Sequence, residues 1–242
     1  MLAAQAGMEL RQTLRNGEQL LLTLVIPVLL LVGFSTMPLL AYGGADRVGF
    51  IAPGTFALAI MSTAFTGQAI KTGFDRQYGV LKRLGATPLP RWGLLGAKTI
   101  SVCAVEIVQL IALAGVALAL GWRPHASGPA DIAMLALFVV LGTATFSGLA
   151  LVMAGNLRAE VTLAGANLVY VLLLGLGGVL FPLAEFPAFI QPALRFLPIT
   201  ALTGGFREVL QVGATLPGHD LLVLAVWTVA SITAASLTFR WE

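Results

Sequence analysis

The chain has 242 residues, of which 58% are hydrophobic and only 10% are charged, and its formal net charge is +3. A soluble globular domain carries about 25% charged residues, and a water-soluble fold of this size could not hide so much apolar surface. The composition therefore excludes an ordinary soluble domain and predicts an integral membrane protein. No basic cluster alternates with aromatic residues, so nucleic acid is not expected as a partner.

Residues 1–19 precede the first long apolar run and predict an amphipathic helix. Small and apolar residues recur on one side at helical spacing, whereas charged residues fall on another side. Such a helix lies in the headgroup plane before the chain enters the membrane, and a plain juxtamembrane extension is the alternative. The apolar run that follows is too long for the core of a signal peptide, so we expect it to be retained as the first span.

Six apolar segments are long enough to cross a bilayer, since a membrane-spanning helix needs about 20 apolar residues. Their apolar runs are continuous, whereas the strands of a membrane barrel would alternate with a period of two. The segments are 20–42, 50–70, 94–121, 132–155, 161–181 and 221–239. The sequence therefore predicts an all-α integral membrane protein with six transmembrane helices.

The placement of Lys and Arg predicts the orientation, because cytoplasmic loops carry an excess of both residues. With the N-terminus inside, ten of the 14 Lys and Arg residues fall on the cytoplasmic side and four on the outer side. The ten are Arg11, Arg15, Lys71, Arg76, Lys82, Arg83, Arg91, Lys98, Arg158 and Arg240, and the four are Arg47, Arg123, Arg195 and Arg207. We therefore expect both termini in the cytoplasm.

Two connections between the expected spans are long. Residues 71–93 form a charged segment that this orientation places in the cytoplasm. Residues 182–220 lie outside and are rich in Pro, Phe and Gly with few charges. We expect this external segment to fold back at the outer membrane surface as short re-entrant helices that are broken at its prolines.

A search for catalytic chemistry finds little. The two histidines, His125 and His219, have no metal-ligand spacing, and the single cysteine, Cys103, lies in an apolar run. No metalloprotease, serine-hydrolase or phosphate-binding glycine motif is present. We therefore expect no catalytic residue, no metal site and no cofactor in this chain.

Glu106 is the one acidic residue expected deep in the membrane. It lies about 13 Å into the third span at 1.5 Å per residue, near the middle of a core about 30 Å thick. Gln109 follows three residues later and therefore shares its helix face. A carboxyl group at this depth is costly unless it is paired, protonated or facing a cavity. Two interpretations remain open: a polar patch on the translocation path or permease interface, or an interhelical hydrogen bond that fixes packing.

The cytoplasmic connection carries a recognisable motif. Residues 74–92 read FDRQYGVLKRLGATPLPRW, and residues 96–98 read GAK. This stretch resembles the membrane subunit of type-2 ABC exporters, in particular the drug-resistance permeases of the daunorubicin-exporter kind, although Pro90 replaces a residue that is often Ser. A second similarity, ahead of the last span, involves Pro187, Leu197, Pro198, Thr200, Phe206 and Arg207. The resemblance extends over essentially the whole chain.

This resemblance implies that a short cytoplasmic helix, residues 74–84, docks into a groove on a separate ATPase subunit that binds ATP and Mg. Two ATPase copies would then drive the permease halves between inward-closed and outward-open states. The alternative is a positively charged loop that contacts lipid headgroups. The residues expected to contribute to coupling are Phe74, Asp75, Arg76, Gly79, Val80, Leu81, Lys82, Arg83 and Leu84.

The resemblance further implies that residues 1–242 form a single permease domain, half of a transporter in a bacterial plasma membrane. The chain would pair with a second copy or a related permease through its first and fifth spans, where Gly165, Gly175, Gly177 and Gly178 would permit close approach. The expected function is export of an amphipathic drug, natural product or lipid. An ion- or proton-coupled carrier and a lipid-modifying membrane enzyme are the alternatives; the first would need several intramembrane charges, the second a catalytic constellation.

Overall fold

The computed structural model describes residues 17–36, 47–80, 82, 91–125, 128–213 and 216–239. Every regular element within these ranges is helical. The main helices are α2 (Gly17–Thr36), α3 (Arg47–Ile60), α4 (Gln68–Gln77), α6 (Arg91–Ala119), α7 (Pro129–Asn156), α8 (Ala159–Leu176) and α11 (Gly218–Thr238). The shorter elements are the π-helices η1 (Met61–Gly67) and η3 (Glu208–Val212), the 3₁₀ helix η2 (Leu183–Glu185), α9 (Gln191–Arg195) and α10 (Pro198–Arg207).

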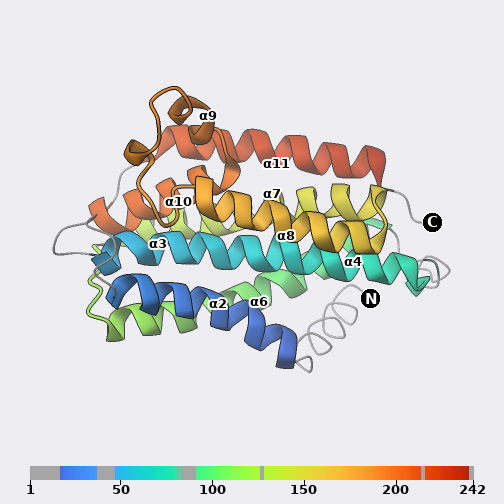
Figure 1. The fold of residues 1–242 in the computed structure, drawn as a ribbon, viewed down its shortest axis with the longest axis horizontal. Coiled ribbons are helices and arrows are strands. Elements are labelled where there is room, and N and C mark those ends of the chain that lie inside the picture. Colours follow the sequence, from blue (N-terminus) through green and yellow to red (C-terminus); the bar gives the residue numbers. More distant parts are fainter. Residues whose placement is uncertain are drawn as a thin grey trace.

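A single long helix runs through the middle of the molecule. α3, η1 and α4 follow one another without a break as Arg47–Gln77, a stretch of 31 residues that we call the central helix. Its most apolar window is 78% buried, and α2, α6, α7, α8 and α10 all pack against parts of it (Figure 1). α2, α6, α7 and α8 therefore pack around this helix, whereas α11 packs against α7 and α10.

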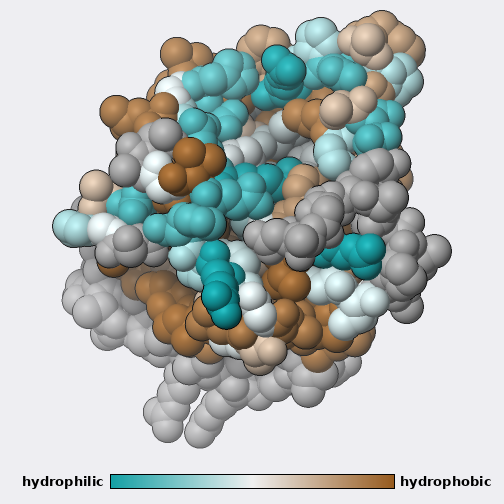
Figure 2. Space-filling view, turned by 90° about the vertical axis from the view of Figure 1, so that its left-hand side faces the viewer, coloured by the Kyte–Doolittle hydropathy of each residue, from teal (hydrophilic) through white to brown (hydrophobic). Residues whose placement is uncertain are grey.

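The bundle has two distinct ends (Figure 1). α4 and α11 finish at one of them, on the right in the figure, and we call it the α4 end. α9 lies at the opposite end, which we call the α9 end. Figure 2 looks onto the α9 end, where hydrophilic and hydrophobic side chains both reach the surface.

α7 and α11 pack more extensively than any other two described elements. Small residues let their backbones approach closely: a side-chain carbon placed on Gly148 would lie only 2.5 Å from Ser231 Oγ. Nearby, Thr145 and Thr228 share a hydrogen bond of 2.8 Å between their hydroxyl groups. Close small-residue contacts and interhelical hydrogen bonds of this kind hold helices together in membranes.

The outer faces of the bundle are apolar. Large hydrophobic side chains point outward from α6, α8 and α11, among them Ile111 at 68%, Val171 at 61% and Leu237 at 80% exposure. Within the described residues, five helices are long and apolar enough to cross a membrane: the central helix, the Thr99–Ala119 part of α6, α7, α8 and α11. α2 adds a shorter apolar stretch, Leu24–Thr36. These findings confirm the prediction of an all-helical membrane protein that crosses the bilayer several times.

Two expected span boundaries differ from those observed. The second span was expected to end at residue 70, but the helix continues to Gln77 because α4 packs against α7 and α8. The fifth was expected to reach residue 181, but α8 ends at Leu176. The chain turns at Gly178, whose φ of 68° lies in the left-handed region that favours glycine.

The segment between α8 and α11 contains short helices, as the sequence predicted, with Pro192 as the second residue of α9 and Pro198 as the first residue of α10. However, α10 packs against α3, α7 and α11 instead of lying on the surface. Arg207, at its end, donates hydrogen bonds to the carbonyl oxygens of Phe50 (3.2 Å) and Val179 (3.1 Å). Its guanidinium also stacks on the Phe50 ring at 3.7 Å, and burial lowers the pKa of Arg207 to about 10, so the side chain remains charged at neutral pH. α10 is thereby anchored to the start of the central helix.

Candidate functional site

Glu106 and Gln109 both point into the bundle from α6. Glu106 is completely buried and Gln109 is 2% exposed, whereas their neighbours Ile107 and Val108 are more than half exposed on the outer face. The prediction that the two polar residues share one helix face is therefore confirmed. That face turns toward the central helix and α7.

Each of the two side chains has a hydroxyl partner on another helix. Thr143 Oγ1, on α7, donates to Glu106 Oε2 at 2.5 Å. Thr63 Oγ1, on η1, donates to Gln109 Oε1 at 2.8 Å. Because both contacts join α6 to a neighbouring helix, the arrangement contains the interhelical hydrogen bonds that the packing interpretation requires.

A third pair extends this arrangement. Ser147 Oγ, one turn beyond Thr143 on α7, donates to Gln68 Oε1 at 2.7 Å, and both side chains are buried. We call the six residues of the three pairs the polar layer: Glu106, Gln109, Thr63, Gln68, Thr143 and Ser147. Sequence reasoning missed the α7 members, although Thr143 and Ser147 are four residues apart and thus lie on one face of an otherwise apolar helix.

The polar layer has unused hydrogen-bonding capacity. Within the described part of the chain, Glu106 Oε1, Gln109 Nε2 and Gln68 Nε2 are buried and have no hydrogen-bond partner. Such groups are expensive in a medium of low dielectric constant, because each has given up water without a replacement. The layer therefore offers two amide donors and one carboxyl oxygen to a polar group that enters the bundle or to a rearranged set of partners.

The π-helix η1 lies directly beside this layer. It spans Met61–Gly67, and it contains Thr63, while Gln68 follows it immediately. π-helical turns are rare, and they occur frequently at functional sites because their wider winding redirects side chains. Nothing in the apolar pattern of the second span indicated it.

At the α4 end, the segment expected to couple to a partner is divided by a turn. Phe74 to Gln77 form the last turn of α4, and the backbone N–H of Gly79 bonds to the carbonyl of Arg76 at 3.0 Å with φ at 69°. This left-handed turn ends the helix. Residues 74–80 therefore do not form part of a single helix, which is what the resemblance had implied for residues 74–84. Beyond the turn Val80 is 37% exposed.

The remaining predicted coupling residues can be placed only in part. Lys82 is helical, whereas Leu81, Arg83 and Leu84 lie outside the described residues. Asp75 is partly buried and takes part in an interaction within the chain. Tyr78, which was not selected from the sequence, stacks on Phe74 with a ring-centroid distance of 6.0 Å and is 68% exposed.

Arg76 and Gln77 join the end of α4 to the turn between α7 and α8. The Arg76 guanidinium donates hydrogen bonds to the carbonyl oxygens of Gly155 and Leu157, the latter at 2.6 Å. Gln77 Nε2 donates to Glu160 Oε1 at 2.8 Å. A cation is well placed there because the last carbonyls of a helix lack partners and carry partial negative charge. We call these five residues the α4–α8 junction.

The junction changes what was expected of Arg76. It was expected to contribute to coupling with a partner, and in the structure its guanidinium binds the end of α7 within the same chain. This contact could not be predicted from the sequence because Gly155 and Leu157 contribute backbone atoms, which any residue could supply.

The glycines expected at a pairing face mostly serve contacts within the chain. A side-chain carbon on Gly165 would collide with Met153, and one on Gly177 would collide with Ile199, while Gly178 lies in a turn. Only Gly175 of these four faces open space. Asn167 is also exposed on α8, in the middle of an apolar helix.

No group of three or more potential metal-binding residues occurs in the part of the chain that the structure describes. Among the polar groups described above, the polar layer lies in the core and the junction lies at the α4 end.

Comparison with known proteins gives the chain its family. The family model described as ABC-2 type transporter matches residues 6–210, which include both the polar layer and the junction. The chain is also 25% identical over 208 residues to the probable doxorubicin resistance ABC transporter permease protein DrrC of Mycobacterium tuberculosis, in the strains CDC 1551 / Oshkosh and ATCC 25618 / H37Rv. The match covers 85% of this chain and 74% of each relative.

These similarities agree with the resemblance found in the sequence. A multi-pass position in the membrane follows from the family and from the apolar helices together, and a bacterial plasma membrane fits the mycobacterial relatives. Members of this family are membrane components of transporters and not themselves enzymes. The chain belongs to the ABC-2 type transporter family.

Proposed function

We propose that this chain is the transmembrane subunit of an ATP-driven exporter that moves an amphipathic drug, natural product or lipid outward across the plasma membrane. The observation that carries the proposal is the ABC-2 type transporter match over residues 6–210. The relatives are named for doxorubicin resistance, which supports an amphipathic cargo. A mostly apolar core with a few unpaired polar atoms suits such a molecule better than a sugar or an ion.

The proposed topology has six spans: α2, the central helix, α6, α7, α8 and α11. The α4 end is cytoplasmic and the α9 end faces outward, with both termini inside. The excess of Lys and Arg expected at the α4 end supports this orientation. Residues 1–19, the proposed interfacial helix, lie almost entirely outside the described residues.

Coupling to the ATPase is proposed at residues 74–84, with ATP and Mg bound in the partner chain and two ATPase copies in the complex. Exposed Tyr78 and Val80 at the α4 end offer an apolar contact surface. The α4–α8 junction would carry movement at this surface to α7 and α8, since Arg76 and Gln77 bind the turn between them. The alternative role, contact with lipid headgroups, would leave the junction without a mechanical function.

We propose that the polar layer contacts the polar part of the cargo during its translocation. Glu106 and Gln109 would supply hydrogen bonds to the polar part of an amphipathic molecule, because Oε1 of the first and Nε2 of the second are unpartnered. The competing role, packing alone, is supported by the bonds to Thr143 and Thr63.

A second copy of the chain, or a related permease, is proposed to complete the transporter. The exposed side of α8 is a suitable face, since it carries Gly175 with open space above it and Asn167 in an apolar surrounding. An exposed amide in the middle of a membrane helix is more stable when it bonds across an interface.

The proposal is tested by isolating the chain from its native membrane in a gentle detergent and identifying and counting its partners. We expect two ATPase copies and a second permease. Val80→Asp should remove the ATPase, because a charge on the contact surface costs desolvation. Val212→Asp is the matched control, since Val212 is 66% exposed at the opposite end and should leave the partners unchanged. Recovery of no ATPase, under conditions that preserve other membrane complexes, would contradict the proposal.

One observation favours a second function. Glu106 is a fully buried carboxyl group of the kind that proton-coupled carriers use. Transport that follows a proton gradient and persists without ATP would support the carrier and exclude the exporter.

A further inference from the structure

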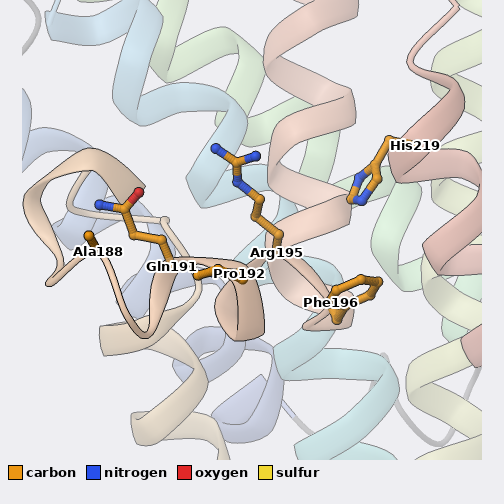
Figure 3. A pocket seen from close by; sticks show the side chains of 6 residues that line it. All are labelled: Ala188, Gln191, Pro192, Arg195, Phe196 and His219. Carbon is orange, nitrogen blue, oxygen red and sulfur yellow. The ribbon is translucent and has the colours of Figure 1, made fainter.

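The α9 end contains a cavity that none of the roles above uses. Its volume is about 350 Å³, and it lies between α9 and the start of α11. The lining residues are Ala188, Gln191, Pro192, Arg195, Phe196 and His219 (Figure 3). This volume is at the lower end of the range for small-molecule sites, about 300–1,000 Å³, and suits a headgroup better than a whole drug.

The cavity has a positive side. Arg195 is exposed, and no described carboxylate lies within ion-pair distance of its guanidinium. The nearby acid Asp220 does not line the cavity, and its Oδ1 lies 3.2 Å from His219 Nδ1. Figure 3 shows Arg195 between Gln191 on one side and Phe196 and His219 on the other. The group left without a counter-ion is therefore a guanidinium, which binds phosphate and carboxylate in a bidentate manner.

The frame around this guanidinium is fixed before any ligand binds. Gln191 Nε2 donates to the carbonyl oxygen of Phe186 at 2.7 Å, which closes the loop ahead of α9. Trp227 Nε1 donates to the carbonyl oxygen of Phe196 at 2.7 Å and ties the end of α9 to α11. Because these bonds hold both sides of the cavity, binding an anion there costs little ordering entropy.

Exposed apolar side chains occur in the lining and on the chain segments that follow or precede it in sequence. Phe189 is 83%, Phe196 62%, Leu216 76% and Leu222 64% exposed. A cation between exposed aromatic and aliphatic side chains is typical of the membrane–water interface, where a protein contacts both the headgroup and the acyl chains of a lipid. A free inorganic anion would make no use of these apolar groups, whereas an amphiphile would.

We propose that this cavity binds the phosphate headgroup of an anionic amphiphile, with Arg195 as the main contact and the chains lying over Phe196 and Leu222. The site would lie at the outer surface, a location that rests on the proposed function and its orientation. It would hold a lipid or an exported amphiphile at the point of exit, away from the polar layer.

The test uses the purified full-length chain in a neutral detergent. The probes are dioctanoyl phosphatidylglycerol, dioctanoyl phosphatidylcholine and inorganic phosphate, and binding is measured by native mass spectrometry. Arg195→Gln should weaken phosphatidylglycerol binding about tenfold or more, because a charge-assisted bidentate contact is lost. Arg123→Gln is the matched control, since Arg123 is an exposed arginine outside the cavity, and it should bind as the unaltered chain does.

The arms of the experiment distinguish the sources of the anion. If millimolar inorganic phosphate competes with phosphatidylglycerol, the site is supported and the anion alone suffices for binding. If phosphatidylglycerol binds without such competition, the site is also supported and the acyl chains are required for binding. Equal binding of the two lipids, or an Arg195→Gln chain that binds phosphatidylglycerol normally, would overturn the proposal. No ATPase takes part in this assay, so a failure of lipid binding here would leave the exporter proposal standing. Conversely, a failure to recover an ATPase partner from the native membrane would leave this site standing.

Discussion

At Glu106, one carboxyl oxygen is bonded to Thr143, and the other is buried without a partner among the described residues. The two substitutions that separate its roles are Glu106→Gln and Glu106→Leu. The amide of Gln keeps an oxygen that accepts from Thr143, whereas Leu leaves that hydroxyl group without its acceptor. We expect Gln to retain ATP-driven transport in proteoliposomes and Leu to lose most of it.

Thermal unfolding of the same variants distinguishes translocation from packing. A packing role predicts that Leu lowers the free energy of unfolding by about 1–3 kcal/mol while transport per folded molecule is kept. Full transport by both variants would exclude any part for Glu106 in the path.

At the scale of elements, the α7–α11 pair depends on the absence of a side chain at Gly148. Gly148→Ala would place a carbon 2.5 Å from Ser231 Oγ and 2.9 Å from the Ser231 carbonyl carbon, so backbone as well as side chain must move. We expect a loss of about 1–3 kcal/mol in stability, measured as a lower unfolding temperature in one detergent.

Gly115→Ala is the matched control for this substitution. Gly115 is also a glycine inside a long helix, α6, but a carbon added there would meet nothing within 4 Å. The control should be neutral or stabilising, because Ala is the better helix former by about 1 kcal/mol. Equal unfolding temperatures for the two variants would show that α7 and α11 do not depend on this close approach.

At the scale of the whole molecule, the α4–α8 junction predicts that partner binding and transport can be separated. Arg76→Ala removes hydrogen bonds from a charged donor to two carbonyl oxygens, each worth about 1.5–3 kcal/mol, and frees α4 from the α7–α8 turn. We expect the ATPase to be recovered in normal amount, but ATP-driven export to fall about tenfold or more.

Arg158→Ala serves as the control, because Arg158 is an exposed arginine in the same turn and its loss changes the charge equally. It should export as the unaltered chain does. If Arg76→Ala lost the ATPase itself, Arg76 would act as a direct docking residue, as the sequence first suggested.

The spans were predictable because each depends on a local property, the length of an apolar run, and five of them recur as helices, although the second and the fifth end at residues other than those expected. The helix face of Glu106 followed from helix geometry alone. Its partner Thr143 could not be predicted, since 37 residues separate them and many hydroxyl groups were available. The same holds for Arg76, which binds backbone oxygens 79 and 81 residues away. The packing of α10 into the bundle escaped prediction because the prolines of residues 182–220 suggested short helices that lie at the membrane surface.

The central helix has a mechanical consequence. A continuous helix of 31 residues is about 46 Å long, well over the roughly 30 Å of a bilayer core. One continuous helix therefore connects the α4–α8 junction with the contact between Arg207 and Phe50, and no loop lies between them. A displacement of Gln77 along the helix axis reaches α10 directly. The winding of this helix departs from the α form at η1, beside the polar layer and its unpaired donors, and Pro53 removes a backbone donor from α3 nearer the Arg207 anchor.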